Sequence, residues 1–301
     1  MKILKFDPSW GLEAYVYMST QQLIVFEDYV SYKIKTFGSG FLLEYQDRFF
    51  CVTADHIIHP DDHYNNETGQ RRRIDYFPQI LTNFKDKDRL GWCRNIPLEC
   101  WDWTEYELDQ ETVLNPAKLN SVTEKIVTEN IDINDEDLPL NVAIASLIDI
   151  AISEIKQPPQ VPILTQEVEL ADGTVLIPAN VLKEPLPSDI IADFNVEDSY
   201  FVAGILHNVQ NAMMLQGTYV RHTDMKFEGF NSDGSSALLK VSGSTDIENW
   251  EGLSGAPVFN YHRELVGMLV RHPGGNKQAE VIPIKTIIEY IDRCIAYESN
   301  Q

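Results

Sequence analysis

Residues 250–258 read Trp-Glu-Gly-Leu-Ser-Gly-Ala-Pro-Val and place one serine in a glycine-rich turn ahead of an apolar run. Gly252 has no Cβ and permits a sharp turn, which can aim the amides of Gly252 and Ser254 at one point. Two convergent N–H donors beside a hydroxyl form an oxyanion hole next to its nucleophile. A plain Gly-Ser turn before a buried strand is the simpler interpretation, so the rest of the chain must decide between the two.

A hairpin that ends in a histidine is the second informative feature. Residues 32–35 alternate polar and apolar side chains as a half-buried strand does, and residues 37–45 and 49–54 predict a strand, a turn and a second strand. His56 follows this second apolar strand. A histidine there is often only a core residue, but together with Ser254 it is interpreted as a catalytic base.

The third feature is a carboxylate inside an apolar strand. Residues 145–153 read Ala-Ser-Leu-Ile-Asp-Ile-Ala-Ile-Ser. Asp149 is costly to bury there unless something hydrogen-bonds it, and the Nδ1–H of a histidine is the partner that a catalytic triad supplies. The alternative is that Asp149 only caps a turn at the end of a strand.

The chain divides into two halves. The prolines of residues 157–162 predict a stiff linker between an N-terminal unit, 1–157, and a C-terminal unit, 163–301. Further strands are predicted in the second unit around a 172–173 turn, and at 200–206, 213–220, 237–241, 257–259 and 264–270. Isoleucines at helical spacing after Pro283 predict a C-terminal helix over about 284–297.

Composition limits the function classes. The 301 residues include 24 basic and 46 acidic side chains, for a net charge of −22, which disfavours binding to nucleic acid. The chain shows no secretory signal and no apolar stretch that could span a membrane. Four scattered cysteines indicate free thiols in a reducing compartment, so a cytoplasmic location is expected.

Residues 60–140 predict strands with long surface loops, and match no pattern that we recognise. The histidines at 56, 59 and 63, beside two aspartates, have zinc-ligand chemistry, but their spacing fits no common site and favours a polar loop. The triplet Arg71-Arg72-Arg73 fits a solvated face better than a contact patch. No metal site is therefore predicted.

Taken together, the motifs resemble those of the trypsin-like (chymotrypsin-fold) serine peptidases, in a non-secreted branch of bacterial type. The likeness rests on Val-Thr-Ala-Asp-His at 52–56, Asp-Ile-Ala-Ile at 149–152 and Gly-Leu-Ser-Gly-Ala-Pro at 252–257, with Gly-Ser-Gly-Phe at 38–41. It covers about residues 30–297, and the chain order His, Asp, Ser is that of chymotrypsin. Asp55 stands where a small residue is commoner.

The resemblance implies an all-β fold of two six-stranded antiparallel barrels, with a C-terminal α-helix and a long insertion, about 60–140, in the first barrel. It implies a catalytic triad of His56, Asp149 and Ser254, an oxyanion hole formed by the amides of Gly252 and Ser254, and no cofactor. The expected activity is that of a serine endopeptidase acting through an acyl-enzyme on protein or peptide substrates.

Substrate contacts also follow from the resemblance. Val270, Arg271 and His272 stand where the family pairs with the substrate backbone as an added strand. Glu248 stands at the base of the family's primary specificity pocket, where a carboxylate favours Lys or Arg at the cut site. A one-residue loop shift, or neutralisation by Arg271, would remove that preference.

Two departures bear on activation. Leu253 replaces the aspartate that pairs with a freshly cut N-terminus in secreted digestive members, and Ile57 replaces the cysteine that follows their histidine. The turn is then either formed constitutively or ordered by a partner or substrate. Residues 60–140 could carry a surface for a regulatory protein partner, and a catalytically silent module that binds peptide or protein is the rival function.

Overall fold

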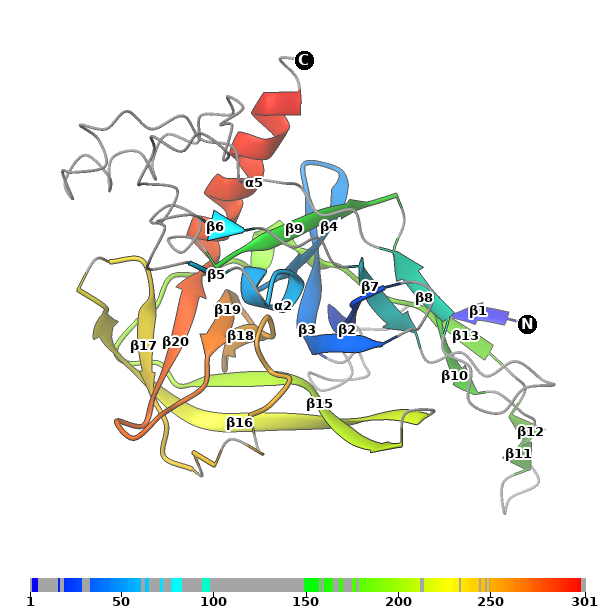
Figure 1. Ribbon diagram of the computed structural model, residues 1–301. Coiled ribbons are helices and arrows are strands. Elements are labelled where there is room, and N and C mark those ends of the chain that lie inside the picture. The colour runs from blue at the N-terminus through cyan, green and yellow to red at the C-terminus, as the bar shows by residue number, and fades with distance from the viewer. Residues whose placement is uncertain are drawn as a thin grey trace.

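The computed structural model describes residues 2–4, 16, 19–28, 33–60, 63–64, 71–72, 77–82, 94–97, 149–156, 158, 160–164, 168–169, 175–176, 179–211, 214–232, 234–243, 245–246, 248 and 250–298. These residues form two β-units that lie against each other, with one long helix at the C-terminus (Figure 1). No helix within these ranges is long and apolar enough to cross a bilayer.

The N-terminal unit is a seven-stranded sheet in the order β8-β7-β2-β3-β4-β9, with β14 paired in parallel to β3. Its strands are β2 (Thr20–Phe26), β3 (Ile34–Tyr45), β4 (Arg48–Thr53), β7 (Phe77–Thr82), β8 (Arg94–Pro97), β9 (Ala151–Ile155) and β14 (Leu186–Pro187). The hairpin predicted over 37–54 is confirmed as β3 and β4. The sheet is open in the described ranges, whereas a closed six-stranded barrel was predicted.

Strands β7 and β8 lie within the segment predicted as an insertion, yet they extend this sheet beyond β2. Phe77 packs beside Ile24, Phe26 and Ile34, so burial of apolar side chains favours this pairing. The same segment contains the two-stranded ladder β5 (His63–Tyr64) and β6 (Arg71–Arg72). Residues 98–148 lie outside the described residues.

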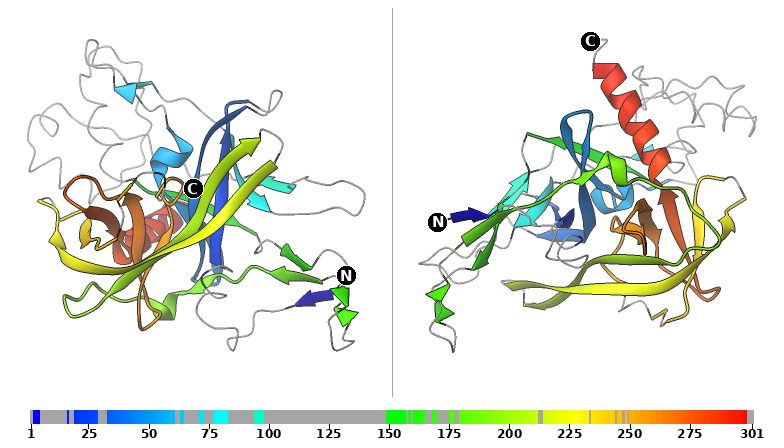
Figure 2. Two further views of the ribbon diagram at one scale, coloured as in Figure 1. Left: turned by 90° about the horizontal axis from the view of Figure 1, so that it is seen from below. Right: turned by 180° about the vertical axis from the view of Figure 1, so that it is seen from behind.

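The C-terminal unit is a closed antiparallel barrel in the order β15-β16-β17-β20-β19-β18. Its strands are β15 (Tyr200–Asn211), β16 (Met214–Phe230), β17 (Ala237–Lys240), β18 (Pro257–Asn260), β19 (Leu265–Arg271) and β20 (Gln278–Pro283). All of the strands predicted from 200 onward are thereby confirmed. β15 and β16 form a long ribbon that reaches from the barrel to β2 and β3 (Figure 2).

Shorter strands and helices complete the fold. β1 (Lys2–Leu4), β13 (Ala179–Leu182) and β10 (Gln160–Leu164) form a three-stranded sheet, and β11 (Val168–Glu169) pairs with β12 (Val175–Leu176) as the 172–173 turn predicts. The proline-rich segment 157–162 was predicted to lack regular structure, but its end enters β10. Pro162 is tolerated because β10 is an edge strand. The helical elements are α2 (Asp55–Ile58), η2 (Ser188–Ile190) and α5 (Ile284–Glu298).

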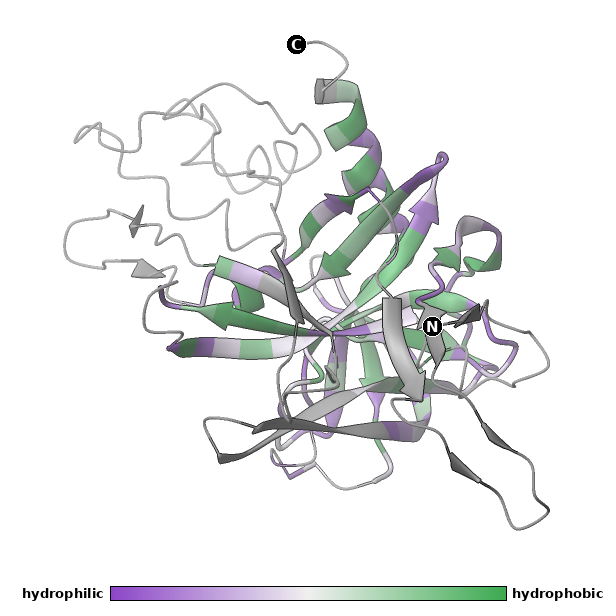
Figure 3. Ribbon diagram, turned by 90° about the vertical axis from the view of Figure 1, so that its right-hand side faces the viewer, coloured by the Kyte–Doolittle hydropathy of each residue, from purple (hydrophilic) through white to green (hydrophobic). Residues whose placement is uncertain are grey.

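One apolar core joins the two units. The cluster contains Phe41 and Phe50 of the sheet, Phe259 and Met268 of the barrel, and Ile287 of α5, each fully buried. Several core strands are continuously buried runs, among them β2, β18 and most of β19, and Figure 3 shows apolar positions along the strands and one face of α5. The predicted helix over 284–297 is confirmed, and its buried stripe attaches it to the barrel.

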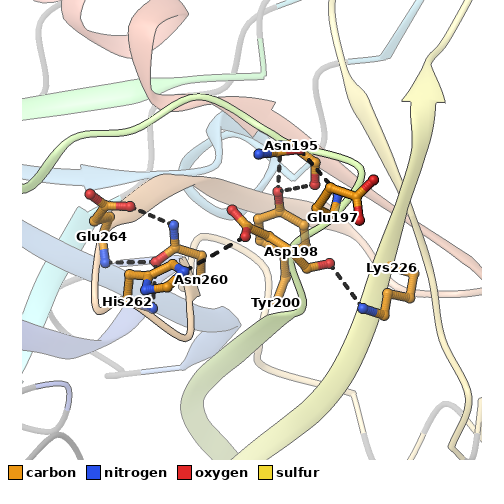
Figure 4. Close-up of polar contacts among 8 residues, drawn as sticks. All are labelled: Asn195, Glu197, Asp198, Tyr200, Lys226, Asn260, His262 and Glu264. Carbon is orange, nitrogen blue, oxygen red and sulfur yellow. Dashed lines mark hydrogen bonds and ion pairs between the residues drawn. The ribbon is translucent and has the colours of Figure 1, made fainter.

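A polar network fixes the outer end of the barrel (Figure 4). The Asn260 Oδ1 accepts hydrogen bonds from the amides of His262 and Glu264, both at 3.0 Å, and so shapes the turn between β18 and β19. The Tyr200 hydroxyl donates to the backbone oxygen of Asn195 at 2.8 Å. These contacts set where β19 begins, and the strand then runs toward the serine turn.

The predicted fold class is confirmed. The described part of the chain is mostly β, with a closed six-stranded barrel, a second β-sheet unit and a C-terminal helix. In the described ranges the N-terminal sheet is open, which departs from the closed barrel that was predicted.

Candidate active site

His56 lies in a one-turn helix that follows directly on a buried strand. β4 ends at Thr53, Ala54 caps α2 in an extended conformation, and Ile57 and Ile58 are both buried in the core. A Cβ added at Gly38 would lie 2.8 Å from Ile57, so the helix packs directly on the β3 backbone. This packing holds the backbone of His56 firmly, while its side chain remains 43% exposed.

Asp149 is bound to His56 through both carboxylate oxygens. The Asp149 Oδ2 lies 2.7 Å from the His56 Nδ1, and the Asp149 Oδ1 accepts the His56 amide at 2.9 Å. β9 begins two residues later and pairs with β4 so that Ala151 faces Thr53. The sheet register therefore brings together residues 93 positions apart. Of the predicted strand 145–153, only residues from 149 onward are described.

The electrostatic environment favours the charged form of His56. Burial alone lowers the pKa of this imidazole, and Arg271 acts in the same direction. The hydrogen bond and charge of Asp149, with the charge of Asp55, outweigh both and raise the pKa above its ordinary value of 6.5. The ring can thus accept a proton and keep it close to a carboxylate.

Ser254 lies in a tight turn at the edge of the barrel. Gly252 and Gly255 have φ angles of 93° and 84°, a region that glycine adopts without steric cost. The Leu253 amide donates to the Trp250 oxygen at 3.0 Å, and the Gly255 amide donates to the Leu269 oxygen of β19 at 2.7 Å. The turn therefore has a defined geometry, with Ser254 partly exposed at its tip.

Two amides of this turn have no acceptor in the described part of the chain: those of Gly252 and Ser254. Most backbone amides in folded proteins are paired with an acceptor or with water. These are the two donors that the sequence assigned to an oxyanion hole.

Strand β3 connects the serine turn to the histidine. The Ser39 amide donates a hydrogen bond to the Ser254 backbone oxygen at 2.8 Å. The Ser39 backbone oxygen accepts a hydrogen bond from the Thr53 hydroxyl at 2.7 Å. Thr53 is three residues before His56, so the turn and the histidine are fixed to the same pair of strands. Among the described residues, no hydrogen bond joins the Ser254 Oγ to His56.

The residues predicted to contact substrate come from the end of β19 and from the loop before the serine turn. Val270 and Arg271 end β19 just after the residue that accepts the Gly255 amide, and His272 follows, exposed. Glu248 is exposed in the loop before the serine turn. Arg271 is 70% exposed and forms an ion pair with Glu280 at 2.7 Å, so the partner that the structure gives it is Glu280.

Other polar groups near His56 have structural partners. The His59 Nδ1 lies 2.7 Å from the Asp55 Oδ1, and His59 is buried. Within the described ranges, no group of three or more His, Cys, Asp or Glu side chains could hold a metal ion. Cys51 and Cys294 are buried free thiols, while Cys93 and Cys100 lie outside the described residues.

Ser39 was not predicted to have a role, although it was part of the Gly-Ser-Gly-Phe motif. A hydroxyl between two glycines in an otherwise apolar strand is an unusual place for a buried polar group. That pattern was the available signal, because a fully buried serine needs a nearby hydrogen-bond acceptor.

No family model matches the chain, and no curated protein matches it in sequence. Among solved structures, the crystal structure of a mutant of the tobacco etch virus protease is similar, with a TM-score of 0.39 and 10% sequence identity. The match covers 89% of this chain and 74% of the other.

Proposed function

We propose that this chain is a serine endopeptidase that cleaves peptide bonds with Ser254 as nucleophile, His56 as general base and Asp149 as the group that orients the base. The observation that carries the proposal is the 2.7 Å contact between the His56 Nδ1 and the Asp149 Oδ2. This contact fixes the tautomer with the proton on Nδ1, so that Nε2 is the nitrogen with a lone pair for the serine.

In the proposed mechanism, the Ser254 Oγ attacks the substrate carbonyl carbon while its proton passes to the His56 Nε2. The carbonyl π-electrons move to the oxygen, and Asp149 stabilises the imidazolium that forms. When the tetrahedral intermediate collapses, the C–N bond breaks and His56 donates its proton to the leaving amine. Water then repeats the sequence on the acyl-enzyme and regenerates Ser254.

The amides of Gly252 and Ser254 would stabilise the negative oxygen in both tetrahedral intermediates. Their lack of an acceptor among the described residues supports this role, because donors already directed at the site need no reorganisation during the reaction. Removal of one such donor typically costs about 100- to 1,000-fold in kcat.

The substrate backbone would pair with Val270, Arg271 and His272 at the end of β19, as an additional strand. This segment is next to the serine turn because the Leu269 oxygen accepts the Gly255 amide. Glu248 would favour a basic side chain at the cut site. Its exposure to solvent makes this a modest preference rather than a strict one.

A binding module without catalysis is the second candidate. It is favoured by one observation: no hydrogen bond joins Ser254 to His56 in the described residues. Catalytic hydrogen bonds are often long without substrate and tighten when it binds, which is compatible with the peptidase. The two candidates differ in whether Ser254 reacts.

A fluorophosphonate probe separates them. We expect the wild-type chain to gain one adduct, mapped to Ser254 by mass spectrometry, and Ser254→Ala to gain none. Ser242→Ala is the matched control, because Ser242 is an exposed serine in the preceding loop, and it should label as the wild type does. An unlabelled wild type, or an adduct that persists in Ser254→Ala, contradicts the peptidase.

A further inference from the structure

Ser39 is a fully buried residue of β3, and three of its hydrogen bonds link the serine turn and Thr53 to β3. Its hydroxyl donates to the Gly252 oxygen at 2.7 Å, and its amide donates to the Ser254 oxygen at 2.8 Å. Its own oxygen accepts the Thr53 hydroxyl at 2.7 Å. A single residue of the N-terminal unit thus holds two carbonyls of the serine turn.

The contact is close because glycines face Ser39 from the other unit. A Cβ at Gly255 would lie 1.9 Å from the Ser39 oxygen and 2.4 Å from the Thr53 Oγ1. A Cβ at Gly204 of β15 would lie 2.8 Å from the Ser39 Oγ. Because of these close approaches, a side chain larger than serine would not fit at position 39. Burial also excludes water that could compete for the hydrogen bond between the Ser39 hydroxyl and the Gly252 oxygen.

The two carbonyls belong to the residues whose amides are the proposed oxyanion donors, and the peptide that carries the Ser254 amide lies between them. Gly252 has the widest conformational freedom in the turn, and a hydrogen bond to its oxygen fixes the plane of the peptide that follows it. The bond to the Ser254 oxygen fixes the other end. With the peptides on both sides held, the peptide that carries the Ser254 amide has a set direction, and the Gly252 amide adjoins one of the held peptides.

Leu253 anchors the middle of the turn. Its side chain is fully buried in the barrel core beside Trp250 and Val258, and it would contact a Cβ at Gly204 at 2.7 Å. It cannot form an ion pair with a cut N-terminus. The contacts that hold the serine turn are therefore the hydrogen bonds from Ser39 and the apolar packing of Leu253, in place of an ion pair to a cut N-terminus.

We propose that Ser39 is a positioning residue that orders the serine turn from within the chain, so that the turn needs neither proteolytic activation nor a partner. Its catalytic consequence rests on the proposed peptidase function. Its structural consequence does not, because the order of the turn can be measured directly.

The first test is the rate of fluorophosphonate labelling. We expect Ser39→Ala to react about 10- to 100-fold more slowly than the wild type, because small displacements of catalytic groups have effects of that size. The pH midpoint of labelling should stay unchanged, since His56 and Asp149 are untouched. Ser19→Ala is the matched control: it removes another buried serine hydroxyl that donates to a backbone oxygen, that of Val16 at 3.1 Å, and should label within twofold of the wild type.

The second test is hydrogen exchange at the Gly255 amide, which donates to the Leu269 oxygen. We expect faster exchange there in Ser39→Ala but not in Ser19→Ala, with the Leu239 amide in β17 unchanged in both. The proposal is overturned if Ser39→Ala labels and exchanges at the same rates as the wild type. It is also overturned if exchange in Ser39→Ala rises equally at the Gly255 and Leu239 amides. If the wild type does not label but exchange at Gly255 rises selectively, the peptidase proposal fails and the role of Ser39 stands.

Discussion

Asp149 directs both of its carboxylate oxygens at one residue, bonding the amide and the ring of His56. The amide bond fixes where the carboxylate lies, and the ring bond fixes how the imidazole is turned. Such a two-point contact sets orientation as well as charge. A carboxylate that only capped a turn would not need to reach the ring.

Asp149→Asn tests this pair. The amide side chain can still accept from the His56 amide but cannot stabilise an imidazolium, so the pKa of His56 should fall below the wild-type value. The labelling rate of Ser254 should drop about 1,000- to 10,000-fold. Titration of the His56 ring protons by NMR checks the first effect, and an unshifted midpoint contradicts it.

The raised pKa of His56 also gives a pH dependence. Labelling requires the neutral ring, so its rate should rise with pH, with a midpoint above 6.5. The stability effect has the opposite direction. Because the folded-state pKa exceeds the unfolded one, the pair stabilises the fold below pH 6.5, and this contribution is lost as pH rises through the folded-state pKa. Denaturant unfolding at several pH values, compared with Asp149→Asn, measures it.

Gly255→Ala separates backbone strain from crowding. Gly234 has a similar φ of 78° but nothing within 4 Å of an added Cβ, whereas Gly255 has Ser39 and Thr53 in the way. Gly234→Ala should therefore cost about 1 to 2 kcal/mol in unfolding free energy. Gly255→Ala should cost about 1 to 3 kcal/mol more, and should abolish labelling. Equal costs in urea unfolding would show that the close approach is absent.

Glu248 governs the proposed preference for basic residues. Because its carboxylate is exposed, Glu248→Gln should lower the kcat/KM ratio of Lys or Arg over neutral cut-site residues only about two- to fivefold. Cleavage of a peptide library checks this. A wild-type preference for large apolar residues at the cut site contradicts the assignment.

At the scale of elements, the sequence predicted the parts whose pattern is local. The β3–β4 hairpin and α5 have regular apolar spacing, and the structure confirms both. The place of β7 could not be predicted, because its pairing with β2 depends on a partner some fifty residues away rather than on its own pattern. The strand β10 was not predicted because Pro162 argues against a strand. Only the sheet order shows that β10 is an edge strand, where proline is tolerated.

Helix α5 connects both units. Ile287 and Ile291 are buried in the shared core, while Asp292 accepts hydrogen bonds from Tyr45 and Gln46 of the β3–β4 turn, each at 2.9 Å. Burial raises the pKa of Tyr45, and Asp292 adds to that effect. The helix therefore stabilises the arrangement on which the site depends.

Ile291→Ala should lower the unfolding free energy by about 2 to 5 kcal/mol, because it leaves a cavity in the core. Glu289→Ala, an exposed position on the same helix, should change it by less than about 0.5 kcal/mol. Urea unfolding followed by far-UV circular dichroism distinguishes the two. Similar small effects would mean that α5 is not packed as described.

At the scale of the whole molecule, the site depends on contacts that no single element contains. The sequence singled out the residues of the proposed site, because glycine turns and strand ends leave local patterns, and the structure brings His56 and Asp149 into contact. It did not predict Ser39 as the link between the units, because its acceptor, Gly252, lies 213 residues away. Closure of the N-terminal sheet was the other miss, since strand pairing is a property of the complete fold.

The most direct measurement is a crystal structure of the protein after reaction with diisopropyl fluorophosphate. We expect phosphorus bonded to the Ser254 Oγ, the His56 Nε2 within hydrogen-bond distance of that oxygen, and a phosphoryl oxygen that accepts hydrogen bonds from the amides of Gly252 and Ser254. An unmodified Ser254, or an adduct whose oxygen faces neither amide while the His56 ring points elsewhere, would contradict it.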